Sequence, residues 1–131
     1  QNYFSGSFPK SIFTIPYLES LVMTSNCFHG NLESDEICNH QYLQVMILDG
    51  LASCEKHTLK IWNPLFSNQA RASTHNSEMN GKIPVCLFES NNLRVLHLGG
   101  NHLTGSLPDI SLSSNLQNLS LAHNRLSGTI P

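Results

Sequence analysis

Sixteen residues of this chain, from Leu93 to Pro108 (LRVLHLGGNHLTGSLP), recur in pattern from Leu116 to Pro131 (LQNLSLAHNRLSGTIP). The two copies start 23 positions apart, and leucine, asparagine, glycine and proline fall at matching places in both. A repeat of this length is one unit that buries its apolar face only by stacking on neighbouring units. The chain is therefore predicted to form an elongated stack, whose function depends on the surface that it displays.

Weaker copies of the pattern extend upstream. The motif Asn-x-apolar-x-Gly occurs at Asn2 to Gly6 and again, 24 positions later, at Asn26 to Gly30. Apolar residues with the spacing Leu-x-x-Leu-x-Leu precede the asparagine, as they do in the two clear copies. They are Leu18, Leu21 and Met23 in one repeat, and Leu43, Met46 and Leu48 in the next, where Leu51 takes the place of the asparagine.

Each part of the pattern has a physical task. The last two apolar residues of Leu-x-x-Leu-x-Leu are two positions apart, which is the period of a strand, so both point inward and stacked repeats form a parallel sheet. An asparagine at each turn can satisfy backbone groups of the neighbouring repeat. This predicted asparagine ladder consists of Asn2, Asn26, Asn101 and Asn124.

A Gly-x-apolar-Pro tail ends four of the repeats, at Gly6 to Pro9, Gly81 to Pro84, Gly105 to Pro108 and Gly128 to Pro131. With this tail the pattern resembles the plant-type extracellular leucine-rich repeat. The resemblance implies an α/β fold, a leucine-rich-repeat solenoid with a parallel β-sheet on the concave face and short 3-10 or helical turns on the convex face. Residues 1–131 are expected to form a single solenoid segment, a fragment without caps.

What the resemblance implies about function is recognition rather than catalysis. Such repeats build the ectodomains of plant receptor-like proteins and receptor-like kinases, which suggests an apoplast-facing, extracellular location and a peptide or protein ligand in defence or signalling. A co-receptor kinase is a further implied partner. Two alternatives are an inhibitor of a pathogen cell-wall-degrading hydrolase, such as polygalacturonase, and a structural spacer without a ligand.

Composition excludes two classes of partner. The formal net charge is −2 and charged residues make up 12% of the chain, against about 25% in an average soluble domain. Nucleic-acid binding is therefore not predicted. The longest apolar run, Val45 to Leu48, is far shorter than the roughly 18 residues of a membrane helix, so membrane attachment is expected only through segments outside this sequence.

The repeat pattern fails at residues 52–76. One interpretation is an irregular island that loops out of the stack, with Lys60, Trp62 and Arg71 as contact residues for a ligand or co-receptor. Another is a degenerate repeat, because Leu43 and Leu93 are two repeat lengths apart; Gln69, Ala72 and Thr74 would then occupy strand positions. A third is sequence that is not native to the domain.

Outward strand positions are predicted to line up in rows across the concave face and to form an extended binding strip. One row is Ser20, Val45, Val95 and Asn118, and the next is Val22, Ile47, His97 and Ser120. Two further rows continue past the strands with Thr24, Asp49, Gly99 and Ala122, and with Ser25, Gly50, Gly100 and His123. The predicted ligand-binding residues are Val22, Thr24, Ser25, Ile47, Asp49, His97, Gly99, Ser120 and His123.

Cysteine, histidine and asparagine raise three chemical questions. Asn118-Leu119-Ser120 is an N-glycosylation acceptor sequence, and Asn118 is predicted to carry a glycan. The Cys/His pairs do not reproduce a zinc spacing, so neither a metal nor another cofactor is predicted. In an oxidising compartment the four cysteines (Cys27, Cys38, Cys54, Cys86) would form one or two disulfides, with three pairings open, while four free thiols remain an alternative.

An enzymatic function is not predicted. His97 and Ser120 occupy matching positions on adjacent strands, so a histidine could contact a serine hydroxyl. Catalysis also needs a group that orients the histidine, oxyanion donors and a pocket that excludes water. Asp49 is expected to lie at least two strands from His97, too far to orient it.

Overall fold

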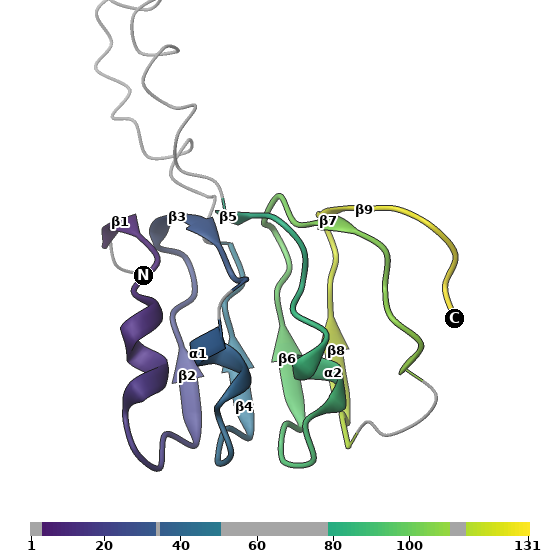
Figure 1. Ribbon diagram of the computed structural model, residues 1–131. Helices are drawn as coiled ribbons and strands as arrows, with labels where there is room; N and C mark the ends of the chain where they lie inside the picture. The colour runs from purple at the N-terminus through teal and green to yellow at the C-terminus, as the bar shows by residue number, and fades with distance from the viewer. Residues whose placement is uncertain (1–3, 34, 51–78, 111–114) are drawn as a thin grey trace, which may run out of the picture.

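The repeats stack side by side in chain order, as the computed structural model of the chain shows (Figure 1). The structure describes residues 4–33, 35–50, 79–110 and 115–131. Its strands are β1 (Ser5–Ser7), β2 (Ser20–Val22), β3 (Cys27–Asn31), β4 (Val45–Ile47), β5 (Met79–Asn80), β6 (Val95–His97), β7 (Thr104–Gly105), β8 (Asn118–Ser120) and β9 (Arg125–Leu126). Its helices are the 3-10 helix η1 (Lys10–Thr14), α1 (Asp35–Cys38) and α2 (Cys86–Glu89).

The principal sheet is parallel and has the strand order β2-β4-β6-β8. Its register pairs Val22 with Ile47, Ile47 with His97 and His97 with Ser120, so the outward residues form the predicted rows. The central residue of each strand points inward because strand side chains alternate between faces. Leu21, Met46 and Leu96 are accordingly buried.

 Strand β4 pairs directly with β6, although the paired residues Val45 and Val95 are 50 positions apart in the sequence. A disulfide between Cys38 and Cys86, which are 48 residues apart in the sequence, also spans this junction. Val45 lies beside Val95, and no strand stands between them. The degenerate repeat, with Gln69, Ala72 and Thr74 in strand positions, and the looped-out island both stay predictions. Residues 51–78 themselves lie outside the described part of the chain.

A second set of strands, which the sequence pattern did not predict, runs along the upper edge of the stack in Figure 1. It comprises the parallel sheet β1-β3-β5, the pair β7-β9 and a bridge between Lys82 and Thr104. These strands coincide with the Asn-x-apolar-x-Gly motif, whose glycine has a left-handed backbone. Gly6, for example, has a φ of 104°, which residues with a Cβ rarely adopt.

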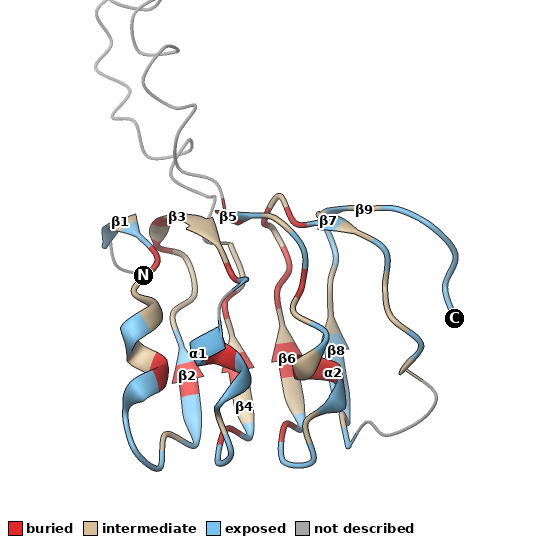
Figure 2. Cartoon of the chain, viewed as in Figure 1, coloured by how far each residue is buried: buried red, intermediate tan, exposed pale blue. Residues whose placement is uncertain are grey.

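The hydrophobic core is a continuous layer between the principal sheet and the convex helices (Figure 2). Phe13 of η1, Ile37 of α1 and Leu87 of α2 supply its convex side. The central leucines show where the core is open, since Leu96 of β6 is 0% exposed but Leu119 of the edge strand β8 is 37% exposed. The fold is thus the predicted α/β solenoid, with helical turns on its convex face.

A disulfide joins α1 to α2. Cys38 and Cys86 have their Cα atoms 5.5 Å apart and connect two neighbouring repeats on the convex side. Cys27, at the start of β3, is also disulfide-bonded. The structure therefore selects one of the pairings that the sequence left open, while Cys54 lies outside the described residues.

Candidate functional site

The concave strip, defined as the two outward rows of β2, β4, β6 and β8 together with the predicted ligand-binding residues that follow them (Thr24, Ser25, Asp49, Gly99 and His123), crosses four strands without interruption. Val22 is its most exposed apolar residue, at 56%. Ile47, Val45 and Val95 are half-buried between their neighbours. The strip is therefore apolar toward its N-terminal strands and becomes polar at His97, Asn118 and Ser120.

A polar network crosses the C-terminal half of the strip. Oδ2 of Asp49 lies 3.5 Å from Nδ1 of His97, and Nε2 of His97 lies 3.0 Å from Oδ1 of Asn118. The other carboxylate oxygen of Asp49 accepts a hydrogen bond of 2.6 Å from the backbone N–H of Gly99. The prediction that Asp49 lies at least two strands from His97 is wrong, because β4 and β6 are adjacent.

The corrected position of Asp49 does not create a catalytic triad. The imidazole of His97 faces the amide of Asn118 at Nε2, where a catalytic arrangement would need the hydroxyl of a nucleophile. The network also lies on an open sheet surface, where water reaches every member. It is better suited to fixing the orientation of His97 than to chemistry.

The other predicted strip residues differ in what they offer a ligand. Gly99 is buried, and a Cβ there would lie 3.2 Å from the carbonyl oxygen of Ala122, so it contributes only backbone. Ser25 and His123 both have a left-handed backbone, with φ of 55° and 57°, at the position that Gly50 and Gly100 occupy in the two central repeats. Thr24 is half-buried and His123 is exposed.

The asparagine ladder lies at the turns that follow the strands. Nδ2 of Asn101 donates to the carbonyl oxygens of Leu48, Leu98 and Gly99, and Nδ2 of Asn124 donates to Leu98 and Leu121. In the first repeat, Oδ1 of Asn26 accepts from the backbone N–H of Phe4. Asn2 lies outside the described residues, as do the island residues Lys60, Trp62 and Arg71.

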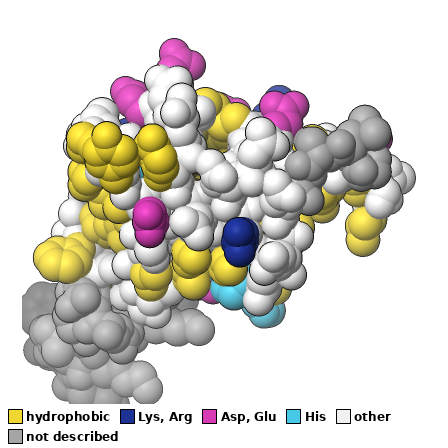
Figure 3. Space-filling view, turned by 90° about the horizontal axis from the view of Figure 1, so that it is seen from below, with side chains coloured by type: hydrophobic (Ala, Val, Ile, Leu, Met, Phe, Trp, Pro, Cys, Tyr) yellow, Lys and Arg dark blue, Asp and Glu magenta, His cyan; other side chains and the backbone are white. Residues whose placement is uncertain are grey.

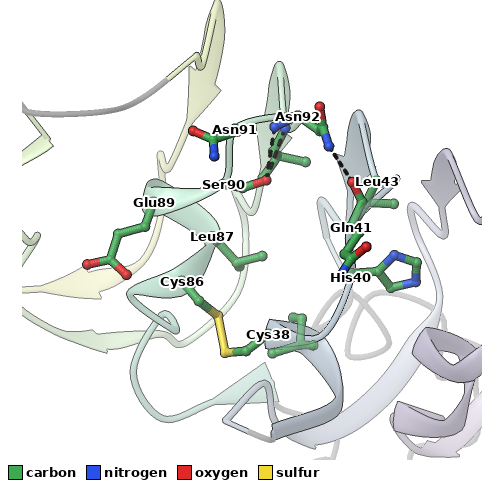
Figure 4. A pocket seen from close by; sticks show the side chains of 12 residues that line it. Cys38, His40, Gln41, Leu43, Cys86, Leu87, Glu89, Ser90, Asn91 and Asn92 are labelled. Atoms are coloured by element: carbon green, nitrogen blue, oxygen red, sulfur yellow. Dashed lines mark hydrogen bonds between the residues drawn. A yellow bond between two sulfur atoms is a disulfide. The ribbon is translucent and has the colours of Figure 1, made fainter.

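A pocket of about 420 Å³ lies between the turns after α1 and α2 (Figure 4). The Cys38–Cys86 disulfide lies beside it, and the Asn92 amide donates to the backbone carbonyl of Gln41 across it. His40 also lines the pocket, and both of its ring nitrogens are buried without a hydrogen-bond partner. Burial lowers the pKa of His40 below its usual value, because desolvation disfavours the charged imidazolium.

Sequence reasoning missed the lower edge, defined as the turns that lead into β2, β4, β6 and β8. Figure 3 views this edge from below and shows hydrophobic side chains gathered over the N-terminal repeats. The exposed residues Ile15, Tyr17 and Tyr42 lie in these turns. The signal that could have found the edge is the residue directly before the first leucine of each repeat, which is Tyr17, Tyr42, Asn92 or Asn115.

The described part of the chain holds neither a metal-binding cluster nor a membrane-spanning helix. Within residues 4–33, 35–50, 79–110 and 115–131, no group of three or more His, Cys, Asp or Glu side chains is placed to hold a metal ion. Over those same ranges, no helix has both the length and the apolar character needed to cross a membrane.

Comparison with known proteins agrees with the geometry. The family model of the leucine-rich repeat matches residues 92–113 and 115–131. The ectodomain of the Arabidopsis receptor kinase HAESA, solved in complex with a peptide hormone ligand, superposes with a TM-score of 0.72 and 27% identity, over 99% of this chain and 18% of that chain. The chain is a leucine-rich-repeat solenoid of the plant receptor-like type.

Two curated relatives from Arabidopsis thaliana place the chain further. Over 96% of its length the chain is 49% identical to a protein named as a probably inactive leucine-rich-repeat receptor-like protein kinase. Over 99% of its length it is 27% identical to receptor-like protein 18. The chain spans only 14% of the kinase and 12% of receptor-like protein 18. It therefore corresponds to a few repeats within much longer proteins.

Proposed function

We propose that the concave strip is a non-enzymatic recognition surface for a peptide or protein ligand, within the extracellular part of a plant receptor-like protein. The observation that carries this proposal is the register of β2, β4, β6 and β8, which aligns outward side chains into rows across four adjacent strands. Neighbouring strands in a sheet lie about 4.8 Å apart, so a row offers a ligand regularly spaced contacts along an extended path.

The character of the strip favours recognition by shape and hydrogen bonding. Exposed Val22 supplies an apolar anchor at one end, and the pair of Asp49 and His97 supplies oriented polar groups toward the other. Few contacts in such an interface carry most of the binding energy. The HAESA ectodomain, which shares this fold, was solved with a peptide hormone, and this supports a peptide as the ligand class.

The proposed location is the plant apoplast. The Cys38–Cys86 disulfide supports it, because disulfides persist in oxidising compartments and are rare in the cytosol. A co-receptor kinase is the second partner that we propose, bound alongside the ligand. Secretion of the chain with both cysteines oxidised is the expected result, and a reduced protein retained in the cytosol would contradict it.

Affinity capture from plant wall fluid tests the function. The chain is compared with a variant that carries Val22→Arg, Thr24→Arg and Ser120→Arg, which crowds the strip with long charged side chains. A control with Ser11→Arg, Val85→Arg and Ser106→Arg adds the same charge at exposed positions outside the strip. A ligand captured by the chain and the control but lost from the strip variant supports the proposal. Equal capture by all three proteins would show that the strip is a spacer surface.

A further inference from the structure

The residue directly before the first leucine of a repeat has different roles in the two halves of the stack. In the C-terminal half it is asparagine, and its amide ties one turn to the previous one: Asn92 donates to the carbonyl of Gln41, and Asn115 donates to Asn91 at 2.6 Å. In the N-terminal half the same position holds Tyr17 and Tyr42. Their ring centroids lie 5.0 Å apart with the planes tilted by 53°.

Folding does not explain this tyrosine pair. Tyr17 is 73% exposed and Tyr42 is 48% exposed, so neither ring is part of the core. Tyr17 also has a left-handed backbone with a φ of 60°, which costs a residue with a bulky side chain about 1–2 kcal/mol. A glycine or asparagine at this position would avoid that strain. The backbone of Tyr17 is therefore strained in order to present an exposed ring beside Tyr42.

A cleft of about 310 Å³ lies beside the pair, between residues 13–17 and residues 39–42. Its lining contains no Asp, Glu, Lys or Arg side chain, and burial lowers the pKa of its histidine, His40, which favours the neutral imidazole. Besides the rings and aliphatic groups, it contains the exposed side chains of Asn39 and Gln41, whose amides make no hydrogen bond with any described residue. Aromatic faces and amides that both donate and accept hydrogen bonds thus face one uncharged space.

From this arrangement we propose that the cleft binds a neutral oligosaccharide. A pyranose ring has C–H faces that pack on aromatic rings and adjacent hydroxyls that both donate to and accept from amides. An acidic polysaccharide would instead require cations, which the lining lacks. A peptide added as a strand would require a free backbone edge, whereas the cleft lies at the ends of β2 and β4, which already pair with each other. The site is separate from the concave strip and adds a second ligand class.

Isothermal titration calorimetry with defined probes tests the proposal. The neutral probes are cellohexaose and laminarihexaose, and the comparison probes are hexagalacturonate and decaproline. We expect a neutral hexasaccharide to bind with a Kd of roughly 1 mM or below, and Tyr42→Ala to weaken binding about tenfold, which corresponds to about 1.4 kcal/mol. Tyr17→Phe keeps the ring and should bind like the unmodified chain.

Tyr17→Gly makes the test independent of folding. This substitution removes the ring and relieves the backbone strain, so its thermal unfolding temperature should not fall while its affinity does. The strip variant with Val22→Arg, Thr24→Arg and Ser120→Arg should bind the oligosaccharide with unchanged affinity. A loss of sugar binding at the cleft is therefore distinguishable from a loss of ligand binding at the concave strip. The proposal is overturned if neither neutral sugar binds at a concentration 10 times the expected Kd of roughly 1 mM. It is also overturned if Tyr17→Gly binds the sugar as tightly as the unmodified chain does, or if only hexagalacturonate or decaproline binds.

Discussion

The side-chain amide of Asn101 donates a hydrogen bond of 3.0 Å to the backbone carbonyl of Leu48, which belongs to the preceding repeat. The same amide donates to Leu98 and Gly99 in its own repeat. One buried side chain therefore satisfies carbonyls on both sides of the junction between β4 and β6. A single substitution can test how much the stack depends on this group.

Asn101→Asp should destabilise the protein by at least about 3 kcal/mol, because it removes the donor and places a carboxylate opposite three carbonyl oxygens. Chemical denaturation measures the free energy of unfolding. Asn115→Ala is the matched control, since Asn115 is exposed and makes one such bond, and its expected loss is below about 1 kcal/mol. Similar losses in the two variants would show that burial does not make the ladder bond more important.

Removal of the Cys38–Cys86 disulfide by serine at both positions should lower the free energy of unfolding by up to about 4 kcal/mol. The crosslink closes a loop of 48 residues and so restricts the unfolded chain. Urea unfolding measures the change, and a loss below about 1 kcal/mol would contradict the expectation.

His40 should make the protein less stable in acid. Its pKa is lowered in the folded state, so the unfolded chain, with a value near 6.5, binds the proton more tightly. The contribution of neutral His40 to the free energy of unfolding is therefore fully present above pH 6.5, the pKa of the unfolded state. It decreases as the pH falls from 6.5 toward the lower pKa of the folded state. His40→Leu removes this term, so its advantage over the unmodified chain should grow between pH 7.5 and pH 5, by at most about 1.4 kcal/mol per pH unit. A difference independent of pH would show that burial does not perturb the imidazole.

Gly100→Ala should destabilise the fold by roughly 1–3 kcal/mol. Gly100 has a φ of 66°, and a Cβ there would lie 3.3 Å from the Cα of Gly50. Gly100→Asn separates the two causes, because asparagine tolerates the left-handed backbone but still places a Cβ against Gly50. Thermal unfolding should rank the glycine protein first, Asn second and Ala third. Equal losses for Asn and Ala would assign the effect to crowding alone.

Asn118 should carry an N-glycan when the chain is secreted from plant cells. The residue is exposed on the edge strand β8, and its amide is accessible although Oδ1 contacts His97. Mass spectrometry of secreted protein should show an added glycan mass that Asn118→Gln abolishes. A mass equal to that of the bare polypeptide would contradict the expectation.

The sequence predicted the stack and its concave rows because these follow from spacing alone. Leucines two positions apart fix which strand residues point outward, and the repeat length fixes which residues are neighbours. The position of Asp49 beside His97 could not be predicted in this way, since spacing alone allows a further repeat within the 50 residues between Asp49 and Gly99. The tyrosine pair was missed for another reason: the residue before the first leucine is variable in the pattern, and only the backbone brings Tyr17 onto Tyr42.

The direct pairing of β4 with β6 also bears on how the chain folds. Elsewhere in the stack, hydrogen bonds between neighbouring repeats join residues that are 21 to 26 positions apart in the sequence. The hydrogen bond between Asp49 and Gly99 joins residues that are 50 positions apart. Closing the longer loop costs only about 0.6 kcal/mol more per doubling, but contacts distant in sequence form more slowly. The stack therefore contains one non-local junction in an otherwise local fold. We expect the repeats on each side to become ordered first, and the meeting of the two halves to set the folding rate.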